Sequence, residues 1–208
     1  MTETRGSSQI LPTSRRDQDA EALYRGLGDL PTPPGHPSLV LLSGLPGSGK
    51  SHFCRELVQL APSLVVLESD ALREILFSHP THGGSENARL FPAVHRLLER
   101  LLRIGHQVAV DATNLRRRNR KMLYDIAIRV GAPLVIIETT APEDMIRQRL
   151  SQREADIAAD RQTDDVSTAG NDVYDRMIQT AQPIRHDHIT VDTSQDITPA
   201  LRQIAAQL

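Results

Sequence analysis

The chain has 208 residues, of which 39% are hydrophobic, a formal net charge of -2 and a single cysteine. This length and apolar content suit one domain with a real core plus a tail, and the charge argues against a protein that coats nucleic acid, because such proteins usually carry a strongly basic face. No apolar segment approaches the ~20 residues of a membrane span, the first twenty residues are too polar for a secretory signal, and one cysteine excludes an internal disulfide. We therefore expect a soluble protein of the cytoplasm.

Residues 1–37 are expected to form an N-terminal extension, partly helical or disordered, ahead of a main unit at 38–208. The segment "DLPTPPGHPS" is rich in proline and poor in apolar side chains, so it predicts stiff turns rather than a packed element. One helix is expected in "SRRDQDAEALYRGL", beginning at Ser14.

From residue 38 onward, short apolar runs alternate with longer stretches of helical period, which predicts parallel strands joined by crossover helices. Strands are expected at 38–43, 63–68, 106–111, 133–139 and 188–193. Helices are expected at 49–60, 70–78, 86–103, 116–130, 142–154, 171–181 and 198–207. Such a chain folds as an α/β/α sandwich of three layers with a five-stranded, mainly parallel sheet, and open sheets of this kind bind ligands beyond the carboxyl ends of their strands.

A glycine-rich segment, "GLPGSGKS", follows the first expected strand and meets an expected helix. Gly44, four residues, Gly49, Lys50 and Ser51 match the pattern of a phosphate-binding loop in the context that this loop requires. Backbone N–H groups would converge on phosphate oxygens, Lys50 would reach the β- and γ-phosphates of ATP, and Ser51 would hold Mg²⁺. A chance glycine turn fits less well, because pattern and context are both complete. The predicted nucleotide-binding residues are Gly44, Leu45, Pro46, Gly47, Ser48, Gly49, Lys50, Ser51 and His52.

The segment "LESDALRE" places Asp70 directly after the second expected strand, with Arg73 three residues later on the same helical face. At this edge a carboxylate could accept the proton of an attacking hydroxyl, and an arginine beside it could hold an anionic group of the same acceptor. The alternative is that Ser69 or Asp70 only caps the helix and that Arg73 is a solvated partner. Spacing alone leaves the two interpretations even.

The segment "VAVDATNL" ends a third expected strand at Asp111, a position from which a carboxylate can assist Mg²⁺ or its water shell. Asn114 is expected either to line the same cleft or to cap the next helix. The basic run from Arg116 to Lys121 is expected to be a solvated first helical turn, with a phosphate-contacting patch as the alternative.

A polar segment from Glu154 to Gly170 has few apolar anchors and is predicted to form a mobile lid. Arg149 and Arg153 precede it, four residues apart on one helical face. Arginines carried on a lid can close over a transferring phosphoryl group, so both are predicted to be catalytic. The alternative is an exposed loop with ordinary surface charges.

The order "GLPGSGKS", "SDALR", "VDATN" and "RLSQR" resembles the P-loop 5′-hydroxyl polynucleotide kinases, over roughly residues 39 to 193. The resemblance implies a P-loop NTPase fold of the adenylate-kinase type, ATP and Mg²⁺ as ligands, and a hydroxyl acceptor, possibly a nucleic-acid 5′ end. It implies Asp70 as the general base and Arg73 as a contact to a phosphate of the acceptor. It places Lys50 and Ser51 on ATP and Mg²⁺, Arg149 and Arg153 on the lid, and Asp111 and Asn114 at the cleft.

Two alternatives remain open at this point. The segment "SDALREILFSHPTH" is also similar to the acceptor region of zeta-toxin-like nucleotide-sugar kinases, in which an aspartate is likewise the base. The same chemistry on a sugar, nucleoside or antibiotic hydroxyl therefore stays possible. A nucleotide-dependent switch or simple ATPase would use the phosphate loop alone, without an acceptor base.

Overall fold

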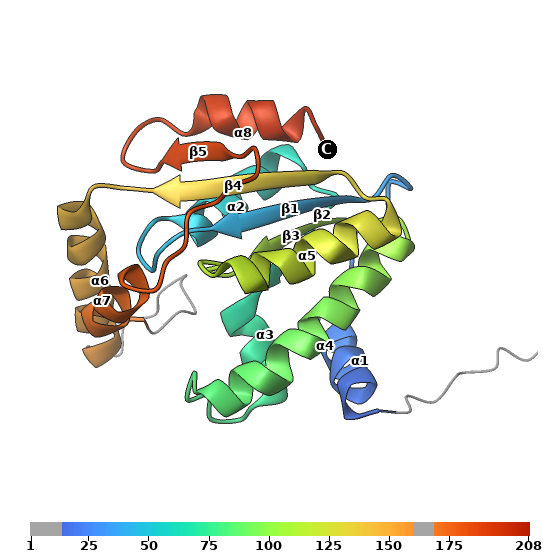
Figure 1. Ribbon diagram of the computed structural model, residues 1–208, viewed down its shortest axis with the longest axis horizontal. Coiled ribbons are helices and arrows are strands. Elements are labelled where there is room, and N and C mark those ends of the chain that lie inside the picture. The colour runs from blue at the N-terminus through green and yellow to red at the C-terminus, as the bar shows by residue number, and fades with distance from the viewer. Residues whose placement is uncertain (1–13, 160–168) are drawn as a thin grey trace, which may run out of the picture.

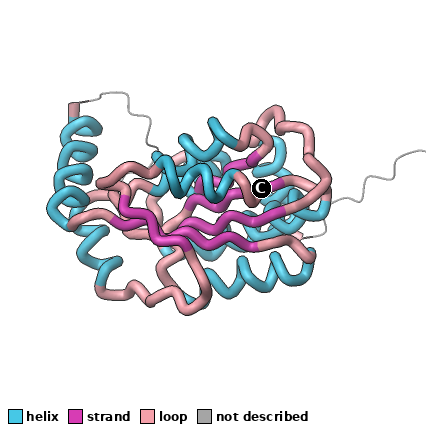
Figure 2. The backbone as a smooth tube through the Cα atoms, turned by 90° about the horizontal axis from the view of Figure 1, so that it is seen from above, coloured by secondary structure: helices cyan, strands magenta, loops and turns pink. Residues whose placement is uncertain are grey.

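The computed structural model describes residues 14–159 and 169–208, and Figures 1 and 2 show their arrangement. The elements, in chain order, are α1 (Arg15–Gly26), β1 (Ser38–Ser43), α2 (Lys50–Leu60), β2 (Leu64–Glu68), α3 (Ser69–Leu76), α4 (Gly84–Arg103), β3 (Gln107–Asp111), α5 (Arg117–Val130), β4 (Leu134–Thr140), α6 (Glu143–Ala158), α7 (Asn171–Ile178), β5 (Ile189–Asp192) and α8 (Thr198–Ala205). None of these helices is both long and apolar enough to cross a membrane.

The strands of the described residues form one parallel sheet with β1 at its centre. Its order is β2-β3-β1-β4-β5, and every neighbouring pair runs in parallel, which confirms the predicted five-stranded sheet. The connections after β1 and β3 leave toward opposite sides of the sheet. These two strands are adjacent, so the gap beyond their carboxyl ends is the topological switch point at which open α/β sheets bind ligands.

Helices cover both faces of the sheet (Figure 1), because alternate residues of each buried strand face opposite sides. Leu39 and Leu41 of β1 pack in a cluster with residues of α1, α4 and α5. Val40 and Leu42 pack on the other face with α2 and α8. This alternation explains why β1 is apolar at four successive positions, and it confirms the three-layer α/β/α sandwich.

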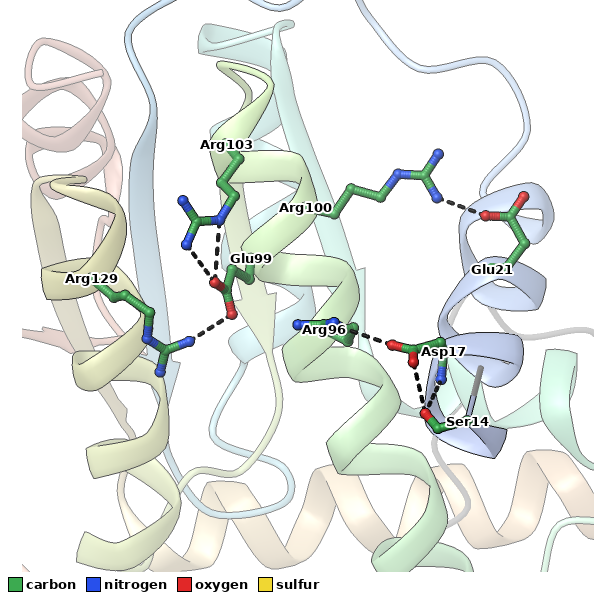
Figure 3. A network of polar contacts seen from close by, with 8 residues as sticks. All are labelled: Ser14, Asp17, Glu21, Arg96, Glu99, Arg100, Arg103 and Arg129. Atoms are coloured by element: carbon green, nitrogen blue, oxygen red, sulfur yellow. Dashed lines mark hydrogen bonds and ion pairs between the residues drawn. The ribbon is translucent and has the colours of Figure 1, made fainter. Parts of the chain in front are cut away.

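The expected helix of the N-terminal extension is α1, with Ser14 as its N-cap. Leu23 is fully buried in the main core, and Arg89 of α4 donates two hydrogen bonds of 2.8 and 2.7 Å to the buried Asp19. Figure 3 shows the exposed side of the same contact, where arginines of α4 reach acidic residues of α1 at Arg96–Asp17 and Arg100–Glu21. The division of the chain at residue 38 stays a prediction, but α1 packs as part of the α4 and α5 layer.

Candidate active site

The glycine-rich loop joins β1 to α2, as the sequence predicts. Gly47 and Gly49 have φ angles of 77° and 85°, in the left-handed region that favours glycine. At Gly44 there is no room for a larger side chain, because a Cβ would lie 2.4 Å from Thr139 Oγ1 and 2.7 Å from the backbone oxygen of Thr139. α2 begins at Lys50, directly after Gly49, so its N-terminal turn is presented to the loop. The Lys50 ammonium donates a hydrogen bond of 3.0 Å to the carbonyl of Leu45, within the loop.

Thr193, just beyond β5, fastens this loop to the neighbouring elements. Its hydroxyl donates to the carbonyl of Ser48 at 3.0 Å and accepts from Arg149 Nη1 of α6 at 2.9 Å. The Arg149 guanidinium also donates to the carbonyls of Gly47 and Thr193. Arg149 is therefore bound to the backbone of the loop itself. Sequence reasoning missed Thr193, because a threonine at the end of a strand carries no distinctive pattern.

The acceptor motif lies on α3 and on the segment between α3 and α4. Asp70 is in the first turn of α3, its side chain 22% exposed, and its carboxylate lies 3.6 Å from His82 Nδ1. Arg73 is buried rather than solvated: its guanidinium pairs with Glu86 at 3.2 Å and donates to Asn87 at 2.8 Å. The solvated alternative for Arg73 is therefore wrong.

Glu86 is the anchor of this segment. Its carboxylate accepts hydrogen bonds from the backbone N–H groups of Thr81 and His82, from the Thr81 hydroxyl, and from Arg73. These hydrogen bonds lower the pKa of Glu86 to about 2. The Thr81 hydroxyl has the largest effect, followed by the two backbone N–H groups and Arg73. The segment between α3 and α4 is thus held by an ionised carboxylate.

Asp111 ends β3 at the carboxyl edge of the sheet, opposite Glu68 in the register with β2, and it is 3% exposed. Cys54 of α2 lies close enough to respond to this charge. Burial raises the pKa of the Cys54 thiol well above its usual value, and the negative charges of Asp111 and Glu68 raise it further. Cys54 is buried, as expected.

The donor set around Asp111 fits Mg²⁺. Ser51, in the first turn of α2, and Asp111 line the same cleft and supply hard oxygen donors. The described residues contain no cluster of three or more His, Cys, Asp or Glu side chains that could hold a metal. Mg²⁺ bound with a nucleotide usually needs only one or two protein oxygens, because waters and phosphates complete its shell.

Asn114 lies on the wall of the same cleft but does not cap α5, because Arg116 is the N-cap residue of that helix. Its backbone adopts a left-handed φ of 46°, and its amide donates a hydrogen bond of 2.8 Å to the carbonyl of Leu42 in β1. Asn114 therefore ties the end of β3 to the strand that carries the phosphate loop.

The basic run at the start of α5 is not uniformly solvated. Arg116 and Arg118 are exposed and line the cleft, in agreement with the solvated interpretation. Arg120 is 2% exposed, and its guanidinium donates to four backbone carbonyls, those of Asn114, Leu115, Gln182 and Pro183. For Arg120 the solvated interpretation is wrong, because the chain beyond α7 folds back over the beginning of α5.

The predicted lid begins as helix, since α6 continues to Ala158 rather than ending at residue 154. Residues 160–168 of this segment lie outside the described residues. Arg153 of α6 donates a 3.5 Å hydrogen bond to the carbonyl of Ala169, on the far side of that gap. α6 packs against Tyr174 of α7 and Leu45 of the loop in a small separate cluster around Leu150, so few apolar contacts hold it.

The phosphate loop, the acceptor motif, Asp111 and the arginines of α6 all line one cleft of about 1990 Å³. Of the predicted site residues, those that line it are Pro46, Gly47, Gly49, Lys50, Ser51, His52, Asp70, Arg73, Asp111, Asn114, Arg149 and Arg153. Gly44, Leu45 and Ser48 belong to the loop, and Ser48 supports it from within through a hydroxyl contact of 2.7 Å with Thr139. The described lining has eight Lys and Arg against four Asp and Glu residues, so the cleft is basic in a chain whose net charge is -2.

A parallel sheet with this loop at its switch point and helices on both faces defines a P-loop kinase-like α/β fold. Residues 39–184 match the AAA domain family, and the chain belongs to that family.

Solved structures of the same fold include Kti12 and two kinases. Kti12 of Chaetomium thermophilum, in complex with ADP-AlF3, is 18% identical with a TM-score of 0.62, over 81% of this chain and 96% of that chain. The APS kinase CysC of Mycobacterium tuberculosis, in complex with AMPPNP and APS, is 18% identical with a TM-score of 0.60, over 84% and 100%. A gluconokinase of Sinorhizobium meliloti is 18% identical with a TM-score of 0.55, over 82% and 90%. At this identity the similarity shows the fold.

Proposed function

We propose that this protein is an ATP-dependent phosphotransferase that moves the γ-phosphoryl group to a hydroxyl group, and that its acceptor is the 5′-hydroxyl end of a polynucleotide. The observation that carries the proposal is that the glycine-rich loop and Asp70 open into the same cleft. A switch or simple ATPase needs only the loop, whereas a partly exposed carboxylate in the same cleft suits a base for an incoming hydroxyl. The kinases among the structures of similar fold support phosphoryl transfer as the reaction.

The proposed reaction assigns one task to each residue. Asp70 accepts the proton of the acceptor hydroxyl while the oxygen forms a bond to the γ-phosphorus, and the bond from that phosphorus to the bridging oxygen breaks to release ADP. Lys50 and the loop N–H groups hold the β- and γ-phosphates, and Arg149 and Arg153 offset the charge of the transferring group. Mg²⁺, held by Ser51 and assisted by Asp111, would neutralise charge on the same phosphates.

Two properties of the cleft favour a polynucleotide acceptor. Its volume of about 1990 Å³ has to hold ATP as well as the acceptor, and it is larger than the roughly 300–1,000 Å³ of most sites for one small molecule. Arg116 and Arg118, at the beginning of α5, also belong to the basic lining, and they could contact the phosphates of a longer acceptor.

One observation favours a small acceptor as the second candidate. Arg73, which the resemblance assigns to a phosphate of the acceptor, is buried and paired with Glu86 and Asn87. A kinase of a small hydroxyl compound does not need that phosphate contact. Among the structures of similar fold, the APS kinase and the gluconokinase carry such compounds in their names.

The two candidates can be separated in one assay. The protein is incubated with γ-labelled ATP, Mg²⁺ and a 5′-hydroxyl oligonucleotide that carries 3′-phosphates, beside a panel of sugars, nucleosides, gluconate and APS. Label on the oligonucleotide supports the proposal. Label only on a small compound rejects the polynucleotide acceptor, and label only in inorganic phosphate rejects the transferase.

Asp70→Asn tests the base. Transfer should fall by about 10²–10⁴-fold, the usual contribution of a positioned base, while ATP binding measured by calorimetry is retained. Glu74→Gln is the matched control, because Glu74 is exposed on the same helix one turn later. An unchanged rate in Asp70→Asn, or an equal loss in both variants, removes Asp70 as the base.

A further inference from the structure

His82 lies beside the proposed base in the cleft. Its Nδ1 lies 3.6 Å from Asp70 Oδ1, and both side chains line the cleft, 37% and 22% exposed. The two residues come from different elements: Asp70 from the first turn of α3, and His82 from the segment that leads into α4. Their approach therefore depends on how that segment is folded.

The backbone at His82 is strained, and the surrounding structure holds the strain. Its φ of 56° lies in the left-handed region, which is uncommon for residues other than glycine. Glu86 fixes this conformation by accepting the His82 N–H at 2.9 Å and the Thr81 N–H at 2.8 Å. Arg73 in turn holds Glu86 through their buried ion pair.

We propose that His82 is a positioning residue for Asp70, and this inference rests on the proposed role of Asp70 as the base. With His82 Nδ1 at 3.6 Å from one carboxylate oxygen, the imidazole favours the rotamer of Asp70 that leaves the second oxygen for the acceptor hydroxyl. The strained backbone and the Glu86 anchor place the imidazole for this purpose. Arg73 then positions Asp70 indirectly, because it holds Glu86 and Glu86 holds the backbone of His82. This indirect role explains why Arg73 is buried and paired. The proton of the acceptor goes to Asp70, and His82 exchanges none in the step.

His82→Gly removes the imidazole and keeps the backbone, because glycine adopts positive φ angles without strain. Turnover should fall by about 10- to 100-fold, by analogy with the loss of partners that orient metal ligands, while the affinity for ATP changes less than twofold. Added imidazole should restore a large part of the lost rate, because it can occupy the vacated space beside Asp70. A merely structural role of His82 predicts no such rescue.

His79→Gly is the matched control, since His79 is an exposed histidine in the same segment. The inference is overturned if His82→Gly keeps the wild-type rate, if imidazole restores nothing, or if His79→Gly loses as much. Asp70→Asn is measured beside them: an unaffected rate there rejects the proposed base itself, which is a separate failure. As a readout that needs no turnover, the ring ¹⁵N shifts of His82 should move in Asp70→Asn, and unchanged shifts also overturn the inference.

Discussion

Replacing Thr193 with valine should loosen the phosphate loop and its contact with Arg149, while Asp70 stays unchanged. The substitution keeps the shape of the side chain and removes its hydroxyl, so the carbonyl of the buried Ser48 loses its donor and Arg149 loses one of its acceptors. A buried carbonyl left without a donor costs about 1–3 kcal/mol. For a chain of this size that corresponds to a fall in Tm of about 2–12 °C.

Part of the same free energy should appear as weaker ATP binding, because the lost contacts hold the backbone of Gly47 and Ser48 in place. A loss of about 1.4 kcal/mol weakens binding tenfold. Differential scanning calorimetry and titration with ATP measure both effects. Thr190→Val is the control, an exposed threonine on β5. If Thr193→Val keeps the wild-type Tm and ATP affinity, or if Thr190→Val changes them as much, the role assigned to this hydroxyl is wrong.

Three further outcomes are expected. Gly44→Ala should lower the free energy of unfolding by about 1–3 kcal/mol, because its Cβ would meet the backbone oxygen of Thr139 at 2.7 Å, and an unchanged urea midpoint would contradict this. Arg120→Lys should lower the free energy of unfolding by about 1–3 kcal/mol for each carbonyl left unpaired, because one ammonium group cannot donate to both chain segments. In the control Lys121→Gln, on the exposed side of the helix, the free energy of unfolding should change by less than about 1 kcal/mol; chemical denaturation measures both variants. The pKa of Glu86 is lowered from 4.5 to about 2, so its ionisation stabilises the fold above pH 4.5 and this contribution is lost as the pH falls from 4.5 toward 2; in Glu86→Gln, urea midpoints should lack that part of the pH dependence.

The fold was predictable because local chemistry and tertiary structure agree along most of the main unit. Each apolar run from residue 38 onward is a strand, and each strand continues into a helix with the expected 3.6-residue period. Gly131 ends α5 with a left-handed φ of 73°, as a glycine directly after a helical pattern predicts. The glycine-rich loop could be predicted for the same reason, because its pattern is local and lies between a strand and a helix.

Sequence reasoning did not predict the burial of Arg120 and Arg73 or the backbone of His82, because these features depend on contacts between separate segments. Arg120 belongs to the basic run from Arg116 to Lys121, and the return of the chain at Gln182 and Pro183 covers it. Arg73 looks like a surface arginine until Glu86, on the next helix, comes to pair with it. The left-handed backbone of His82 has no glycine or asparagine to signal it, because the hydrogen bonds that hold it come from Glu86.

The strand order has a consequence for how the chain is made. Val40 of β1 finds its neighbours at Ala109 and Val135, so the strand that carries the phosphate loop leaves the ribosome long before either partner exists. β2 follows soon after but cannot help, because its place is beyond β3. During synthesis a strand with four successive apolar residues therefore has both edges unpaired, and unpaired strand edges favour pairing with other chains. Fragments that stop before β4 should aggregate rather than fold, and in the cell the nascent chain should depend on chaperones until β4 has emerged.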